Sequence, residues 1–247
     1  MKIASAVLSF VVSLILFAGV LGAAPRGIQS IGGFEKQAMD ATFALYVAPL
    51  NRFICSATAV RVQQDRHSKR YGYLLLSAGH CVYGEPSDFT FAVAEEIGGR
   101  LVPVAPVKAR LGNAEDVSLF YMETAKKYPV IELGDESSET IGDAEINPNF
   151  TAGLTKQLAY ARIASGVIGE NEHCPICMGT FLIHETAGPG ASGSAVISEK
   201  THKVIGIAII AGVAGIGVEP ISTVRKALSE PDEYEQLHQL PSDDDDN

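Results

Sequence analysis

Short apolar segments separated by turns recur along most of this chain, and this pattern limits the folds open to it. Each segment is rich in β-branched, aromatic or other apolar residues, and Gly, Pro or charged residues stand between them. Many short strands with turns between them indicate β-barrels or a β-sandwich. The predicted strands are Ala41–Val47, Phe53–Val60, Tyr71–Ser77, Phe89–Glu95, Val102–Arg110, Val117–Met122, Leu158–Ile168, Thr180–Glu185, Ser194–Ser198 and Val204–Ala211.

Three other segments interrupt this pattern. The polar, basic stretch Arg61–Arg70 predicts a solvated loop, and Glu123–Pro129 predicts a linker between two halves of the chain. Ser222–Leu228 is the one helix that the sequence predicts.

The first 24 residues have the pattern of a secretory signal peptide. Lys2 is their only charge, an apolar run extends from Ile3 to Ala24, and small residues close that run. A basic start, an apolar middle and a small-residue cleavage site are typical of such signals. We expect cleavage after Gly22, and hence a secreted or periplasmic protein without a membrane segment. Because the apolar run is long enough to span a bilayer, an uncleaved anchor is the alternative.

Acidic residues are concentrated at the C-terminus. The net charge is −10, but eight acidic side chains and no Lys or Arg lie in residues 230–247. Without them the chain carries 21 acidic and 19 basic side chains, so its body is nearly neutral. Such a body has no field that attracts nucleic acid, and we expect no nucleic-acid partner. Residues 229–247 are predicted to be a solvated tail.

The four cysteines indicate disulfides if the protein is exported to an oxidising compartment. Cys55 and Cys81 are 26 positions apart, and closing a loop of that size contributes ~3 kcal/mol in the chain-entropy description. For the Cys-x-x-Cys pair Cys174 and Cys177, a local disulfide, a redox site and a zinc site are the alternatives. A strand-like segment follows the pair, whereas redox motifs usually open a helix, so we favour the local disulfide.

The stretch Gly188–Val196 reads Gly-Pro-Gly-Ala-Ser-Gly-Ser-Ala-Val and favours neither helix nor strand. Glycine allows sharp turns, and an oxyanion hole needs backbone N–H groups aimed at one point. We therefore interpret the stretch as a nucleophile loop, in which Ser192 attacks and the N–H groups of Gly190 and Ser192 hold the oxyanion. An ordinary turn between strands is the alternative.

A serine nucleophile needs a base and a carboxylate that orients this base. His80 ends a predicted strand, and Asp116 stands at the start of another. Alone, such a histidine is more often structural and such an aspartate is commonly a turn residue. Together with Ser192 they supply the side chains that nucleophilic catalysis requires.

Together, three stretches resemble the chymotrypsin-fold serine proteases. They are Leu76-Ser77-Ala78-Gly79-His80-Cys81, Asp116-Val117-Ser118-Leu119 and Gly190-Ala191-Ser192-Gly193-Ser194. Their order of histidine, aspartate and serine is that of chymotrypsin and differs from that of α/β-hydrolases and subtilisins.

This resemblance covers roughly residues 40–228 and implies an all-β fold of two six-stranded antiparallel Greek-key barrels with a short C-terminal helix. The first barrel would span about 40–126 and the second about 127–228, after an N-terminal segment 25–39. The resemblance also implies a catalytic triad, a protein or peptide substrate, no metal or organic cofactor, and a Cys55–Cys81 disulfide. The implied triad is His80, Asp116 and Ser192.

Further segments resemble HtrA-type and related bacterial trypsin-like peptidases. They are Leu133–Ser137, Ile141–Asp143, Ala161–Val167 and Pro220–Arg225. HtrA proteases carry a PDZ domain after the protease domain, and we expect none here because only about 20 residues follow.

Ala191 departs from the family pattern. Many members have Asp before the serine, where it pairs with a freed N-terminus, and others have Asn. Ile31-Gly32-Gly33 resembles such an N-terminus, but its partner carboxylate is missing at Ala191. We expect activity without that ion pair, and an oxyanion hole that is less well supported.

The resemblance places the primary specificity pocket between the segment before Ser192 and a late strand. No charged residue stands at the position that holds an acid in trypsins, so we expect a small or medium uncharged side chain in this pocket, with loose selectivity. An inward-pointing Glu185 would instead favour Lys or Arg. The predicted pocket residues are Thr186, Ala187, Gly188, Ala208, Ile209 and Ala211.

The sequence thus predicts a secreted serine endopeptidase that works through an acyl-enzyme. Two alternatives stay open, a catalytically weak or inactive binding protein on the same fold and a serine esterase. The oligomeric state is not indicated by any feature of the sequence.

Overall fold

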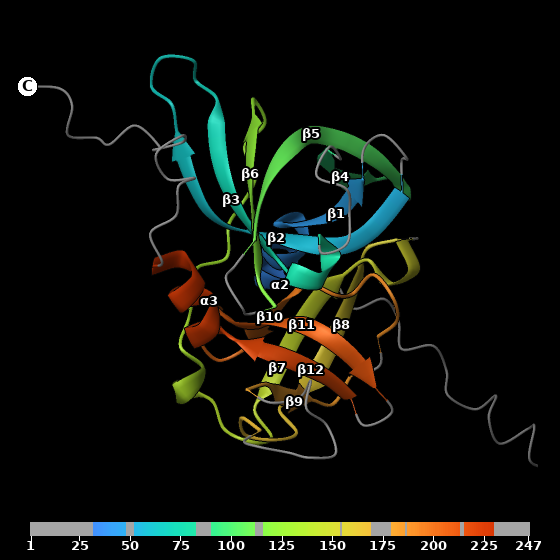
Figure 1. Ribbon diagram of the computed structural model, residues 1–247, viewed down its shortest axis with the longest axis vertical. Helices are drawn as coiled ribbons and strands as arrows, with labels where there is room; N and C mark the ends of the chain where they lie inside the picture. Colours follow the sequence, from blue (N-terminus) through green and yellow to red (C-terminus); the bar gives the residue numbers. More distant parts are fainter. Residues whose placement is uncertain are drawn as a thin grey trace, which may run out of the picture. The chain divides into compact units, whose positions relative to one another are not determined.

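The computed structural model describes residues 32–47, 52–82, 90–111, 116–153, 155–168, 179–185, 187–212 and 215–229. Within these ranges strands predominate, and they form the two six-stranded sheets of Figure 1. No helix in the same ranges is long and apolar enough to cross a bilayer. The predicted signal peptide and acidic tail lie outside the described residues.

The first sheet closes into a barrel with the strand order β1-β2-β3-β6-β5-β4. Its strands are β1 (Thr42–Val47), β2 (Arg52–Gln64), β3 (Tyr71–Ser77), β4 (Phe91–Ile97), β5 (Arg100–Leu111) and β6 (Ser118–Thr124). Register shifts in the β1–β2, β2–β3 and β4–β5 pairs bend the strands and help the sheet to close. Inward-facing side chains such as Phe43, Leu75 and Phe120 are fully buried and fill the barrel.

The second sheet has the strand order β8-β7-β10-β11-β12-β9. Its strands are β7 (Ala144–Asn149), β8 (Gln157–Arg162), β9 (Phe181–Ile183), β10 (Ala195–Ser198), β11 (Val204–Gly212) and β12 (Gly215–Pro220). Its outer strands approach each other, because Ile163 bridges to Ile183 and the His184 N–H donates to the Arg162 carbonyl at 2.8 Å. The sheet is therefore barrel-like, and the predicted pair of six-stranded antiparallel barrels is confirmed.

One apolar cluster extends through both sheets. It includes Phe43 and Leu75 of the first sheet together with Ile146 and Ile207 of the second. A smaller cluster fills the interior of the second sheet. Because the larger cluster is continuous, the two sheets are packed as one body, and the loops at their junction are held from both sides.

Two α-helices flank the sheets. α3 (Ile221–Ser229) is the predicted C-terminal helix and buries Val224 and Ala227. α2 (Gly33–Asp40) was not predicted, and the N-terminal segment 25–39 therefore ends in a helix. Its sequence has no clear apolar stripe, and tertiary contacts hold it instead. Gln37 donates to the Val130 carbonyl at 3.0 Å, and the Phe34 ring stacks on the His202 ring.

Two predicted boundaries are wrong by more than two residues. β2 continues to Gln64, where the sequence predicted a loop from Arg61 onward, because its polar end pairs with β3 up to Tyr71. β8 ends at Arg162 instead of Ile168, although backbone hydrogen bonds continue from Ala164 to Leu182 and from Ile168 to Thr180.

Candidate active site

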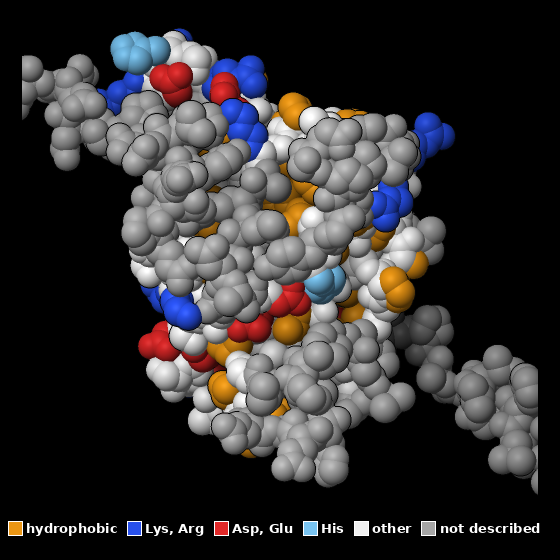
Figure 2. All heavy atoms as spheres, in the orientation of Figure 1, with side chains coloured by type: hydrophobic (Ala, Val, Ile, Leu, Met, Phe, Trp, Pro, Cys, Tyr) orange, Lys and Arg blue, Asp and Glu red, His pale blue; other side chains and the backbone are white. Residues whose placement is uncertain are grey.

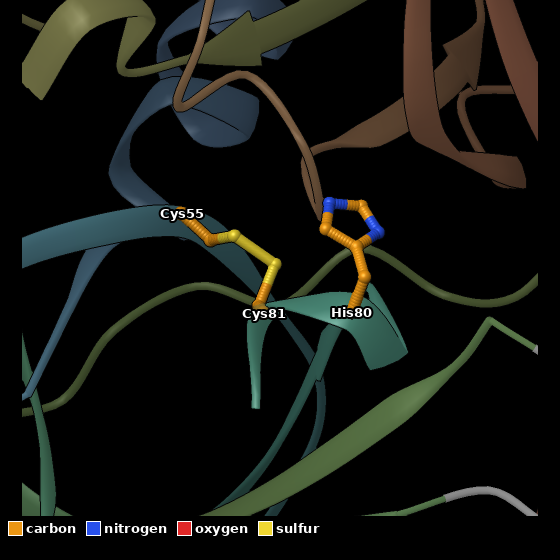
Figure 3. Close-up of side chains that lie close together, drawn as sticks. All are labelled: Cys55, His80 and Cys81. Carbon is orange, nitrogen blue, oxygen red and sulfur yellow. A yellow bond between two sulfur atoms is a disulfide. The ribbon is translucent and has the colours of Figure 1, made fainter. Parts of the chain in front are cut away.

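His80 lies on a single turn of 3₁₀ helix, η2 (Gly79–Cys81), directly after β3. The neighbouring Cys81 forms a disulfide with Cys55 of β2, as Figure 3 shows. In this view the imidazole stands beside the disulfide, and a ring nitrogen lies within 4.8 Å of the two sulfur atoms. The disulfide that the family resemblance implied is thus formed, and it fixes the turn that carries His80 to the neighbouring strand.

Asp116 makes two contacts with His80. The imidazole Nδ1 lies 2.8 Å from Oδ2, and the backbone N–H of His80 donates to Oδ1 at 2.6 Å. Gly79 permits this approach, because a Cβ at that position would lie 3.1 Å from Asp116 Oδ1. An aspartate on Nδ1 orients the ring and leaves Nε2 to act as a base.

The Ser192 loop reaches across to the first barrel. The Ser56 N–H of β2 donates to the Ser192 carbonyl at 2.9 Å. At Gly193, where φ is +82°, an added Cβ would lie 2.9 Å from the Ala78 nitrogen and closer still to Ser77 Oγ. Only glycine fits this position. The loop therefore packs against the end of β3, which leads directly into the turn that carries His80.

The structure brings His80 and Asp116 into contact and places the Ser192 loop beside them. Among the described residues, the hydrogen bonds of His80 are the two to Asp116, so none joins the imidazole to the Ser192 hydroxyl. In unliganded sites of this kind, catalytic hydrogen bonds are often long and tighten only when substrate binds. The complete triad stays a prediction at this point.

Some backbone N–H groups of the Ser192 loop donate to carbonyl groups of the protein, and others do not. Ala191 donates to the Gly188 carbonyl at 3.2 Å, Gly193 to the Ala208 carbonyl at 2.7 Å, and Ser194 to the Ala191 carbonyl at 3.0 Å. In the described part of the chain, the N–H groups of Gly190 and Ser192 donate to no backbone carbonyl. These two groups are the ones that the sequence assigned to the oxyanion hole.

Asn147 and Ser194 form hydrogen bonds that hold the loop at Ala191, the residue that departs from the family pattern. The Ser194 hydroxyl donates to the Ala191 carbonyl at 2.6 Å, and Asn147 Nδ2 donates to the Ser194 hydroxyl at 2.9 Å. All three residues are buried. A neutral network thus holds the segment where other family members use an aspartate. The sequence did not predict a role for Asn147, and the signal that could have revealed it is the run Asn147-Pro148-Asn149, which puts two amides close together in one short segment.

Residues 57–207 match the trypsin-like peptidase domain family, which is more than half of the chain. This chain belongs to the trypsin-like peptidase family. A search of curated protein sequences found no significant match.

Solved structures of HtrA-type proteases have a similar fold. The HtrA-type protease AlgW with a decapeptide aligns with a TM-score of 0.61 at 17% identity, over 81% of this chain and 67% of that chain. The serine endoprotease from Yersinia pestis aligns with a TM-score of 0.57 at 18% identity, over 80% of this chain and 65% of that one. The trypsin-like peptidase thus spans about two thirds of the length of these chains, and the likeness shows a shared fold.

The predicted specificity pocket of this trypsin-like peptidase is partly described. Ala187 packs against the cluster inside the second sheet, which includes Ala208. Ile209 belongs instead to the cluster shared by both sheets, since successive residues of β11 face opposite sides. Gly188 is half-buried, whereas Thr186 and the side chain of Ala211 lie outside the described residues.

Glu185 stands two residues before Ala187 in the chain and carries a carboxyl group. Its Oε1 lies 3.5 Å from Asn149 Nδ2, and its Oε2 is buried without a hydrogen-bond partner among the described residues. Burial raises the pKa of Glu185 to about 7. An uncompensated buried carboxyl group of this kind favours a cationic or hydrogen-bonding partner.

The sulfur atoms near His80 are not available to a metal ion. Within the described ranges, one group of His, Cys, Asp and Glu ligand atoms lies close enough for a shared ion, namely Cys55, His80 and Cys81. Both sulfurs are in the disulfide of Figure 3 and so cannot act as thiolate ligands. The Cys174–Cys177 pair lies outside the described residues.

Charged side chains are mixed on one face of the molecule. Figure 2 shows the described Lys and Arg side chains spread over this face and interleaved with acidic ones. That face therefore presents no continuous basic surface among the described residues.

Proposed function

We propose that this trypsin-like peptidase is a secreted or periplasmic serine endopeptidase with the catalytic triad His80, Asp116 and Ser192. The contact between His80 and Asp116, beside the loop of Ser192, is the observation that carries the proposal. The Cys55–Cys81 disulfide suits an exported protein, since such bonds persist in oxidising compartments.

The proposed mechanism assigns one role to each group. His80 Nε2 accepts the proton of Ser192 Oγ as this oxygen attacks the carbonyl carbon of the scissile peptide bond. Asp116 stabilises the imidazolium, and the N–H groups of Gly190 and Ser192 bind the oxyanion. The imidazolium then protonates the leaving amine, and water hydrolyses the acyl-enzyme by the same steps.

A serine-reactive fluorophosphonate probe and a casein-derived peptide library test this proposal. Wild-type protein should be labelled and should cleave peptides, whereas Ser192→Ala should do neither while keeping its fold by circular dichroism. The matched control Ser137→Ala changes an exposed serine away from the site and should behave as wild type. Unlabelled wild type would favour an inactive binding protein, and labelled protein that cleaves only esters would favour an esterase.

We propose a small or medium uncharged side chain in the specificity pocket, on the basis of its apolar residues Ala187 and Ala208. The buried Oε2 of Glu185, which has no hydrogen-bond partner among the described residues, favours a second candidate, cleavage after Lys or Arg. The library distinguishes them. Cleavage after basic residues that Glu185→Gln abolishes would support the second candidate, and cleavage after Ala or Val in both proteins would support the first.

A further inference from the structure

Ser56 is a fully buried serine of the first barrel that contacts several segments of the active-site region. Its N–H donates to the Ser192 carbonyl at 2.9 Å, and its carbonyl accepts from the Ser77 hydroxyl at 2.7 Å. Its hydroxyl donates to the Gly190 carbonyl at 2.8 Å and accepts from the Phe150 N–H at 3.0 Å. One residue of β2 therefore binds both residues whose N–H groups were assigned to the oxyanion hole.

The hydroxyl of Ser56 restrains a glycine that has wide conformational freedom. Gly190 has φ of +96°, a region that favours glycine, so its own backbone preference does little to fix it. A peptide unit is planar and is trans throughout the described residues, so holding the Gly190 carbonyl fixes the plane of the Gly190–Ala191 unit.

The peptide unit on the other side of Gly190 is held as well. The Pro189 carbonyl accepts from the Ala152 N–H at 2.6 Å. In a trans unit the N–H points opposite to the carbonyl, so this bond turns the Gly190 N–H away from Ala152. Ala152 itself has φ of +58°, which a non-glycine residue keeps only where its surroundings hold it. The Phe150 bond to Ser56 anchors the start of that same turn.

We propose that Ser56 is a positioning residue of the oxyanion hole. Its hydroxyl holds the Gly190 carbonyl and the Phe150 N–H together, and it thereby aims the Gly190 N–H at the carbonyl oxygen of the substrate. This inference rests on the proposed serine protease function.

Removing the hydroxyl would leave two buried backbone groups without their partner. Buried polar groups in that state favour rearrangement toward new partners. Here the groups that would move are the two peptide units beside Gly190. The Gly190 N–H would then no longer point at the carbonyl oxygen of the substrate. Ser192 would be disturbed less, because it is held by the backbone N–H of Ser56, which an alanine retains.

Ser56→Ala tests the proposal, with kinetics on a peptide substrate and inhibition by the matching peptide aldehyde, whose adduct with Ser192 carries an oxyanion. We expect kcat to fall about 10–100-fold with KM nearly unchanged. The aldehyde Ki should rise by a similar factor, whereas the Ki of the cleaved product peptide should not change. The pH at which kcat/KM reaches half of its maximum should be the same as in the wild type, because the His80–Asp116 pair is intact.

Ser198→Ala is the matched control. Ser198 is equally buried and its hydroxyl also accepts from backbone N–H groups, but it is the last residue of β10, where the β10–β11 turn begins. This variant should lose stability and keep the wild-type kcat and aldehyde Ki. Ser56→Gly serves as a second variant if Ser56→Ala does not fold, and it should show the same kinetic loss.

The two possible failures are distinguishable. Wild-type kinetics in a folded Ser56 variant, or an equal loss of aldehyde and product binding, would overturn the role of Ser56 and leave the protease assignment standing. Wild-type protein that neither reacts with the fluorophosphonate nor cleaves peptides would overturn the proposed function, and this inference with it.

Discussion

Glu145 is a fully buried acid inside the second sheet. Neither of its carboxyl oxygens has a hydrogen-bond partner among the described residues. Burial, together with the nearby carboxylates of Glu139, Asp143 and Glu199, raises its pKa to about 8. At neutral pH this side chain is therefore protonated in the folded protein, whereas it ionises near pH 4.5 in the unfolded chain.

Glu145→Gln should reduce the pH dependence of stability. The unfolded chain releases this proton first, so the free energy of unfolding of the wild type should fall as pH rises from about 4.5 to about 8. Glutamine keeps the shape of the side chain but does not titrate. The melting temperature of Glu145→Gln at pH 8 should therefore be a few degrees higher than that of the wild type. Thermal melts at pH 5, 6.5 and 8 measure this. Glu132→Gln, which changes an exposed glutamate that does not act on Glu145, is the control. Equal slopes for wild type and Glu145→Gln would contradict the prediction.

At the scale of the element, prediction succeeded where the information was local. β3 was predicted with its observed bounds, Tyr71–Ser77, because it is a continuous apolar run. His80 and Asp116 were found by their motifs, although they are 36 residues apart. No role was predicted for Ser56, because that role depends on Gly190, which is 134 residues away. No residue next to Ser56 in the sequence indicates this contact. Helix α2 was missed for the same reason, since its stabilising contacts are with distant residues.

Helix α2 should depend on its aromatic contact. The Phe34 and His202 rings stack with centroids 3.9 Å apart, and α2 itself buries little apart from Ala38. Phe34→Ala should therefore lower the free energy of unfolding by about 1 kcal/mol. Urea unfolding measures this loss. Tyr160→Ala, which removes an exposed aromatic side chain of β8, is the control and should have almost no effect. A Phe34→Ala midpoint equal to that of the control would show that the stack does not hold the helix.

At the scale of the whole molecule, the two sheets depend on each other. The apolar cluster common to both includes Leu75, Ile146 and Val224. Polar contacts also join the two halves, such as the Ala195 N–H of β10 to the Thr58 hydroxyl of β2 at 3.3 Å and the bonds of Ser56. Neither sheet can separate without exposing this cluster, so the described body should unfold in one cooperative transition.

The double variant Cys55→Ala, Cys81→Ala tests this cooperativity together with the disulfide. The bond closes a separation of 26 residues, so its loss should lower the free energy of unfolding by ~3 kcal/mol. The transition should stay single, because the disulfide joins two segments of the first barrel, and the shared cluster, to which both cysteines belong, keeps all its large apolar side chains. His80 should keep its place at moderate temperature, since Asp116 binds its backbone N–H and the Ser118 hydroxyl donates to the Ala78 carbonyl at 2.8 Å.

The chain has no tryptophan, so far-UV circular dichroism in urea is the probe, with peptidase activity followed in parallel. Two separated transitions in either protein would show that the sheets unfold independently, and an unchanged midpoint would show that the disulfide adds no stability.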